Sequence, residues 1–125
     1  MSGITLDAGA LIALDREGRR AVELIARTIS RGKRITIPAT ALAQAIRNPA
    51  KQVRISRLLR RDVTDVVSLD EHDSKLVGSL LARTGTSDIV DAHVVVCARR
   101  TGQYVLTSDP GDFERLAPDL DLVLI

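Results

Sequence analysis

Five short apolar runs constrain the fold of this chain, because none of them alternates between apolar and polar residues. They lie at Ile4–Leu6, Ile35–Ile37, Val66–Leu69, Tyr104–Thr107 and Leu122–Ile125. Continuous apolar runs of this length are typical of strands that are covered on both faces, as the strands of a parallel sheet are. The pattern therefore predicts a five-stranded sheet that is mainly parallel.

The segments between these runs have the spacing of helices. The predicted helices are Ala21–Ile29, Ala39–Arg47, Ala50–Arg61, Asp70–Arg83, Asp88–Arg100 and Asp112–Leu116. Asp88–Arg100 is apolar on nearly all sides, so it should be the most buried helix. Strands that alternate with helices indicate an α/β fold, here a three-layer sandwich with the sheet in the middle. No repeat or linker interrupts the pattern, so we expect one domain over residues 1–125.

The composition argues against several classes of protein. Aromatic residues make up only 2% of the 125 residues, which disfavours nucleic-acid binding by base stacking. The formal net charge of +2 is compatible with a polyanionic partner but does not require one. The sequence does not start like a signal peptide, and no apolar run approaches the roughly 18 residues of a membrane helix. We therefore expect a cytoplasmic protein that does not enter a membrane.

Cysteine and histidine are too sparse to predict a zinc site. Cys97 is the only cysteine, and its apolar neighbours in VVVC predict a buried, unreactive thiol. His72 and His93 stand alone, without further cysteines or histidines at the spacing of zinc ligands. Each histidine is therefore expected at the surface or in the core, not as a ligand.

Aspartates follow the predicted strands at the positions where parallel sheets carry functional groups. Asp7 follows the first strand directly, and Asp109 lies two residues after Thr107, the last residue of another strand. Asp88 and Asp91 share one face in the first turn of the helix before that strand. Because functional groups gather beyond the carboxyl ends of parallel strands, these carboxylates should converge. Clustered carboxylates raise each other's pKa and call for a cation, and oxygen ligands favour Mg²⁺ or Mn²⁺.

Each aspartate also has an ordinary structural interpretation. Asp88 is a suitable helix cap after Ser87, and Asp109-Pro110-Gly111-Asp112 is a good turn sequence. Asp7 and Asp91 fit this interpretation less well, because each interrupts an apolar stretch and a buried carboxylate without a partner is costly. Taken together, the residues favour a metal site.

Four segments resemble the motifs of the PIN-domain family, and in particular those of VapC-type toxin ribonucleases. ITLDAGALIALD resembles the opening strand with its catalytic aspartate, here Asp7, and ITIPATALAQAIR resembles the second strand and helix. DIVDAHVVVCA places Asp91 at the next catalytic position. YVLTSDPGDF resembles the last motif, with Thr107, Ser108 and Asp109, and with Asp112 nearby.

The resemblance implies an Mg²⁺- or Mn²⁺-dependent endoribonuclease that hydrolyses RNA phosphodiester bonds. It implies that Asp7, Asp91 and Asp109 hold the metal and that Thr107 or Ser108 orients a carboxylate or the phosphate. The supporting metal ligands would be Asp88 and Asp112.

The chain departs from the family pattern at Gln44, which stands where the family usually has a glutamate. Glutamine keeps a coordinating carbonyl but loses the charge and one candidate base, which Asp88 could replace as a source of negative charge. A catalytically impaired PIN module that acts by binding RNA or protein is the alternative.

A basic segment without acidic residues runs from Gln44 to Arg61. Arg47, Lys51 and Arg54 approximate one stripe on the predicted helix, which suits contact with RNA phosphates but also suits an ordinary solvated face. The resemblance implies that this region also meets a small antitoxin. It further implies that a C-terminal segment of the antitoxin inserts near the acidic edge, and that the protein is a homodimer.

Two other α/β folds with aspartates at strand ends fit less well. A phosphoacceptor receiver domain would have paired acids after the first strand and a lysine late in the chain. Here Ala8 follows Asp7, and no lysine occurs after Lys75. A haloacid-dehalogenase-type phosphatase would have an Asp-x-Asp motif, and Gly9 occupies the second aspartate position.

Overall fold

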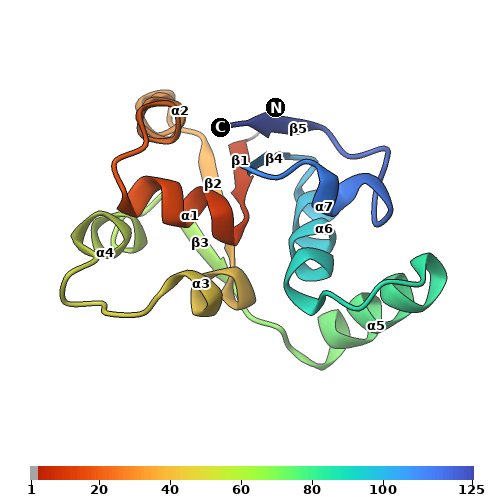
Figure 1. Ribbon diagram of the computed structural model, residues 1–125. Helices are drawn as coiled ribbons and strands as arrows, with labels where there is room; N and C mark the ends of the chain where they lie inside the picture. Colours follow the sequence, from red (N-terminus) through yellow and green to blue (C-terminus); the bar gives the residue numbers. More distant parts are fainter. Residues whose placement is uncertain (1–2) are drawn as a thin grey trace.

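A computed structural model describes residues 3–125. Its centre is a sheet of five strands in the order β3-β2-β1-β4-β5, and every neighbouring pair is parallel. The strands are β1 (Gly3–Leu6), β2 (Arg34–Pro38), β3 (Thr64–Val67), β4 (Tyr104–Thr107) and β5 (Leu122–Leu124). The predicted parallel sheet of five strands is confirmed (Figure 1).

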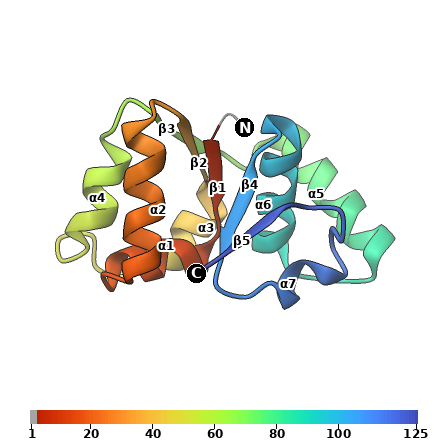
Figure 2. The ribbon, with the colours of Figure 1, turned by 90° about the horizontal axis from the view of Figure 1, so that it is seen from above.

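Helices cover both faces of this sheet, as the three-layer prediction requires. The helices are α1 (Ala8–Asp15), α2 (Arg19–Ser30), α3 (Ala39–Ala45), α4 (Val53–Leu59), α5 (Glu71–Thr84), α6 (Ile89–Thr101) and α7 (Gly111–Glu114). Helices α1, α2 and α4 lie on one side of the strands, and α5 and α6 lie on the other (Figure 2). Helix α3 contacts both α1 and α6 and so connects the two outer layers.

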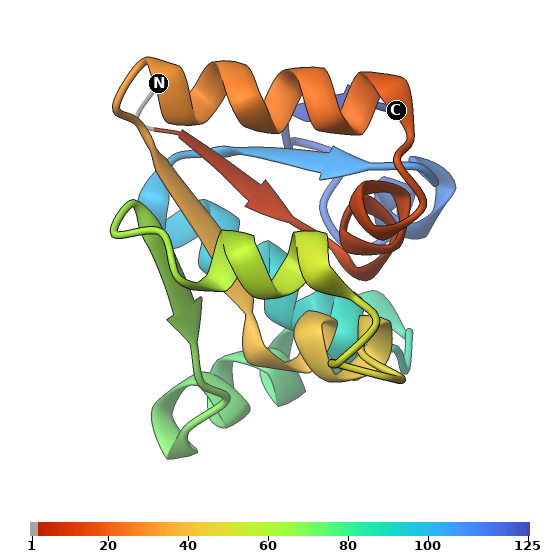
Figure 3. The same ribbon diagram turned by 90° about the vertical axis from the view of Figure 1, so that its left-hand side faces the viewer.

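The strand order has a switch point between β1 and β4. The chain runs from β1 outward to β2 and β3, and then returns to add β4 and β5 on the other side of β1. The order therefore reverses between β1 and β4, which is where open α/β sheets bind ligands. Figure 3 shows both strands pointing to the end of the sheet where α1 begins. Leu6 pairs with Leu106 there, and the Asp7 amide donates to the Leu106 carbonyl at 3.3 Å.

The core is aliphatic, apart from Phe113, which is 1% exposed. Helix α6 has six buried residues, more than any other helix within residues 3–125, although the shorter α1 buries a similar share. One of the six is Cys97, and burial raises the pKa of its thiol to about 12. The predicted burial of Cys97 is therefore confirmed, and α6 is the most buried of these helices by number of buried residues though not by share. No helix within residues 3–125 combines the length and the apolar character needed to cross a bilayer.

The sequence-based prediction missed α1. Its segment AGALIALD is apolar at nearly every position, so it lacks the alternation of apolar and polar faces that identifies a helix at a surface. The structure explains this composition, because Ala8, Ala10, Leu11 and Leu14 are buried beneath α2 and α4 and beside α3.

The third strand was predicted too late in the chain. It spans Thr64–Val67 and not Val66–Leu69, because Thr64 pairs with Ile35 of β2 at the strand's start. As an edge strand it tolerates polar residues, and Asp65 pairs with Arg34 at 2.7 Å on its exposed side.

Candidate active site

Asp7 is the most constrained residue at the carboxyl edge of the sheet. It caps α1, and its Oδ1 accepts a hydrogen bond from the Ala10 amide at 2.8 Å. The side chain is buried, and burial raises its pKa, although hydrogen bonds from the Thr107 hydroxyl and the Ala10 amide oppose that rise. The negative charges of Asp112 and Asp109 raise the pKa further. Asp7 is therefore a fixed carboxylate that lies near two others.

Asp88 and Asp91 belong to the first turn of α6. Asp88 is the N-cap, and its Oδ1 accepts from the Asp91 amide at 2.9 Å. Burial is the main reason that the pKa of Asp91 rises to about 7, and the charges of Asp88, Asp112 and Asp7 add to the effect. Asp91 is thus close enough to interact electrostatically with Asp7, which follows β1, and with Asp112, which follows β4.

Asp109 and Asp112 come from the turn after β4. The Asp109 amide donates to Thr107 Oγ1 at 3.0 Å, and Asp109 Oδ1 accepts from the Gly111 amide at 3.1 Å. Burial, and then the charge of Asp109 and a hydrogen bond with it, raise the pKa of Asp112. The Thr107 hydroxyl also donates to the Asp7 carboxylate, so it links that carboxylate to the backbone amide of Asp109.

The structure therefore brings five predicted residues into one electrostatic cluster, which we call the carboxylate cluster: Asp7, Asp88, Asp91, Asp109 and Asp112. These aspartates also have the ordinary structural roles of helix caps and turn residues, because Asp7, Asp88 and Asp109 each accept a local backbone hydrogen bond. Structural and functional interpretations of these residues are thus compatible.

Gly9 is a site residue that the sequence-based analysis did not assign. A Cβ at this position would lie 2.5 Å from Ser108 Oγ and 3.4 Å from Asp7 Oδ1. Only the absence of a side chain lets the exposed Ser108 hydroxyl approach the start of α1. The signal available in the sequence was a glycine two residues after the strand-end aspartate.

The oxygen donors of the cluster fit a hard divalent cation. The pKa of Asp7, Asp91 and Asp112 is raised, partly because like charges are close, and a bound cation would relieve this repulsion. Within residues 3–125, no three Asp, Glu, His or Cys side chains lie close enough together to hold an ion in their present conformations. Asp88, Asp109 and Asp112 are exposed, so their carboxylates are open to solvent.

Gln44 lies on α3, and its side chain is exposed. Helix α3 packs against α1 and α6, the two helices that Asp7 and Asp88 cap. The Gln44 side chain is neutral, so it adds no negative charge to the carboxylate cluster. The negative charge of that cluster comes from its aspartates.

The predicted basic stripe is wrong in its geometry. Helix α4 begins at Val53, so Arg47 and Lys51 lie in the preceding loop and do not share a helix face with Arg54. Arg47 and Lys51 are exposed, and Arg54 pairs with Glu17 at 2.8 Å. Pro49 and the non-helical residues around it explain the later helix start.

The buried Gln52 organises this loop and was not anticipated. Its Oε1 accepts from the Arg47 and Asn48 amides at 2.9 and 3.0 Å. Its Nε2 donates to the Ala45 carbonyl at 3.0 Å and to Asp15 Oδ2 at 3.4 Å. A single carboxamide therefore holds the loop that presents Arg47.

A groove of about 380 Å³ lies between α2 and α4. Apolar side chains that include Ile25, Ile29 and Leu58 line it, together with arginines 54, 57 and 61. This groove combines an apolar surface with positive charge.

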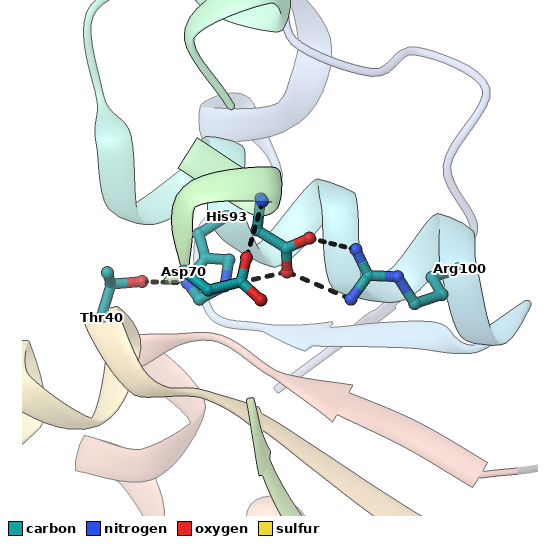
Figure 4. Close-up of polar contacts among 5 residues, drawn as sticks. Thr40, Asp70, His93 and Arg100 are labelled. Carbon is teal, nitrogen blue, oxygen red and sulfur yellow. Dashed lines mark hydrogen bonds and ion pairs between the residues drawn. The ribbon is translucent and has the colours of Figure 1, made fainter. Parts of the chain in front are cut away.

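The two histidines have the positions expected of them. His72 is exposed, and His93 is fully buried in α6. Thr40 and His93 share a hydrogen bond of 2.7 Å (Figure 4). The other ring nitrogen, His93 Nε2, lies 4.0 Å from Asp73 Oδ2.

Comparison with known proteins assigns the family. The model of the PIN domain matches residues 4–118, so the chain belongs to the PIN-domain family. None of the curated proteins matches it.

Solved structures share the fold at low identity. VapC20 of Mycobacterium tuberculosis, described as a toxin that cleaves the sarcin–ricin loop, superposes with a TM-score of 0.72 at 16% identity, covering 98% of this chain and 100% of that one. VapBC from Salmonella typhimurium, bound to DNA, gives 0.69 at 20% identity and covers 98% of both chains. VapBC2 from Rickettsia felis, bound to a promoter fragment, gives 0.67 at 14% identity and also covers 98% of both.

Proposed function

We propose that this PIN domain is a divalent-metal-dependent endoribonuclease, the toxin of a VapBC-type toxin–antitoxin pair. The observation that carries the proposal is the carboxylate cluster, in which burial and neighbouring negative charges raise the pKa of Asp7, Asp91 and Asp112. The likeness in fold to VapC20 supports RNA as the substrate class.

The chain's own residues would prepare the site for hydrolysis of a phosphodiester bond. Asp7, Asp91 and Asp109 would hold Mg²⁺ or Mn²⁺, with Asp88 and Asp112 beside them. The bound ion would supply Lewis-acid stabilisation of phosphate charge and an acidified water. Asp7 is kept in place by Ala10 and Thr107, so it offers a preorganised oxygen.

Proton occupancy at Asp91 sets a condition for cation binding. With a pKa raised to about 7, this carboxyl holds its proton more tightly than an ordinary aspartate, and a cation must displace that proton. The hydroxyl of Ser108 lies beside Gly9 at the cluster and is exposed, which suits a hydrogen bond to a phosphate oxygen.

We assign substrate binding to three cations, the exposed Arg47 and Lys51 and the half-buried Arg54. Arg47, Lys51 and Arg54 would bind RNA phosphates without reading sequence. Their arrangement in a loop and at the start of α4 forms a patch on two elements.

We propose the antitoxin as the occupant of the groove between α2 and α4. Its apolar lining suits an amphipathic helix, and the arginines 54, 57 and 61 suit acidic residues at that helix's edges. Basic residues in a C-terminal segment of the antitoxin would complement the carboxylate cluster. A homodimer is also proposed, on the family resemblance, and light scattering of the purified protein tests it.

A nuclease assay with added metal tests the proposed function. The wild-type protein is expected to cleave RNA when Mn²⁺ or Mg²⁺ is added, and Asp91→Asn is expected to abolish this cleavage. Asp121→Asn, which changes an exposed carboxyl outside the cluster, is the matched control and should cleave like wild type. If Mn²⁺ produces no cleavage that Asp91→Asn removes, the proposed function is wrong.

The alternative function, a PIN module that binds RNA or protein without cleaving, is favoured by one observation. Gln44 provides no charge where the family usually has glutamate. If this loss inactivates the site, Gln44→Glu will create metal-dependent cleavage that the wild type lacks. If the wild type is active, Gln44→Glu will change the rate of an existing reaction.

A further inference from the structure

A chain of polar side chains crosses the interface between α3, α5 and α6 (Figure 4). Thr40 Oγ1 and His93 Nδ1 are 2.7 Å apart, and His93 Nε2 is 4.0 Å from Asp73 Oδ2. Asp73 in turn accepts two hydrogen bonds from the Arg100 guanidinium, one of them at 3.1 Å. One polar path therefore joins α3, α5 and α6. We call it the Thr40–Arg100 path, and its members are Thr40, His93, Asp73 and Arg100.

The middle of this path is inaccessible to solvent. His93 is 0% exposed and Asp73 is 2% exposed, whereas Arg100 reaches the surface. Within residues 3–125, His93 Nε2 is a buried polar atom without a hydrogen-bond partner. Burying polar groups costs free energy unless each group meets its polar partner. The buried groups of this path therefore favour the arrangement of the helices that brings them together.

The donor and acceptor roles along the path depend on the tautomer of His93. Nε2 faces the Asp73 carboxylate at 4.0 Å, and Asp73 pairs with Arg100. In the tautomer with the proton on Nε2, Nδ1 accepts a hydrogen bond from the Thr40 hydroxyl. A residue without a hydroxyl at position 40 cannot make this contact.

Thr40 is the second residue of α3, and Gln44 lies one turn later on the same face. Helix α3 packs against α1 and α6, whose first turns contain carboxylates of the cluster. We propose that the Thr40–Arg100 path positions α3 so that Gln44 faces the carboxylate cluster. Thr40, His93, Asp73 and Arg100 are thus positioning residues. The inference rests on the proposed function, because it gives Gln44 a place in that site.

Paramagnetic broadening by Mn²⁺ tests this placement without using activity. In the wild-type protein, substoichiometric Mn²⁺ should broaden the NMR signals of the Asp91 backbone amide and the Gln44 side-chain amide. Thr40→Ser keeps the hydroxyl and should preserve both effects. Thr40→Val keeps the shape but removes the donor, so it should weaken broadening at Gln44 and leave Asp91 unchanged.

Kinetics provide the second measurement. Thr40→Val should lower kcat about tenfold with KM unchanged, because misplacement of a site residue reduces rate without removing substrate contacts. In a Gln44→Ala background the same substitution should have no further effect. A merely structural role for Thr40 would instead lower thermal stability and leave kcat unchanged at temperatures well below unfolding.

The outcomes separate this inference from the proposed function. Broadening of Asp91 but not of Gln44 in the wild type, or equal broadening of Gln44 in wild type and Thr40→Val, overturns the inference alone. The absence of both broadening and cleavage in the wild type overturns the proposed function, and the inference with it.

Discussion

Asp91→Asn should make the metal-free protein more stable while it removes activity. Asp91 is partly buried beside Asp88, Asp112 and Asp7, and its pKa of about 7 shows that its ionised form is disfavoured in the folded state. In the unfolded chain the same carboxyl ionises near its ordinary pKa of 3.8. The amide introduced by Asp91→Asn removes the charge and can still donate a hydrogen bond to Asp88.

The magnitude follows from the pKa difference. A rise from 3.8 to about 7 corresponds to about 4 kcal/mol at about 1.4 kcal/mol per unit. Since Asp91 is partly exposed, solvent screening reduces this, and we expect about 2 kcal/mol. A raised carboxyl pKa costs no stability below pH 3.8, and the cost grows as pH rises toward 7 and is then constant. The variant's advantage should therefore be full near pH 8.5 and about a quarter as large near pH 4.5.

Urea unfolding in EDTA at these two pH values measures the effect. Asp121→Asn, an exposed carboxyl outside the cluster, is the control and should match wild type at both. Added Mn²⁺ should stabilise the wild type and leave Asp91→Asn unchanged, because the cation needs the ionised carboxylate. Equal stabilities of wild type and Asp91→Asn near pH 8.5, or a difference independent of pH, would refute the electrostatic reasoning.

Three further substitutions test other parts of the structure. Gln52→Ala should lower the free energy of unfolding by about 2 kcal/mol, because buried loop amides lose their acceptor; a urea midpoint like that of wild type would contradict this. Gly9→Ala should displace the Ser108 hydroxyl and reduce RNA cleavage about as much as Ser108→Ala does. Its free energy of unfolding should change by less than about 1 kcal/mol. If Ser108→Ala reduces cleavage and Gly9→Ala does not, this reasoning is refuted. Arg100→Met should cost about 2 kcal/mol near neutral pH, because it leaves the buried Asp73 carboxylate unpaired. Arg100 lowers the pKa of Asp73, so this loss should shrink as pH falls below the ordinary range of aspartate; an equal loss at low pH would show that packing is responsible.

The central strands and the position of the cluster were predictable from local sequence. Ile35–Ile37 and Tyr104–Thr107 are continuous apolar runs, and parallel strands place Asp7 and Asp109 at one edge whatever the details of packing. The edge strand β3 was predicted with a shift, because Thr64 and Asp65 are polar residues that only its exposed position permits.

The remaining features depend on contacts between distant parts of the chain. Helix α1 has no polar face, so only its burial identifies it. Gln52 is an unremarkable polar residue until the loop folds around its carboxamide. His93 and Asp73 are neighbours only because α5 packs on α6, and neither the spacing nor the composition of those helices indicates this.

Cys97 makes this protein a convenient one to label. It is the only cysteine in the sequence, it is 1% exposed, and burial raises the pKa of its thiol to about 12. Thiolates and not thiols react with maleimides and similar reagents, so we expect Cys97 to react only slowly in the folded protein at neutral pH. Cysteines introduced at surface positions are therefore the thiols that react, so one cysteine on α3 and one on α6 allow a pair of dyes to be attached without first removing a native residue.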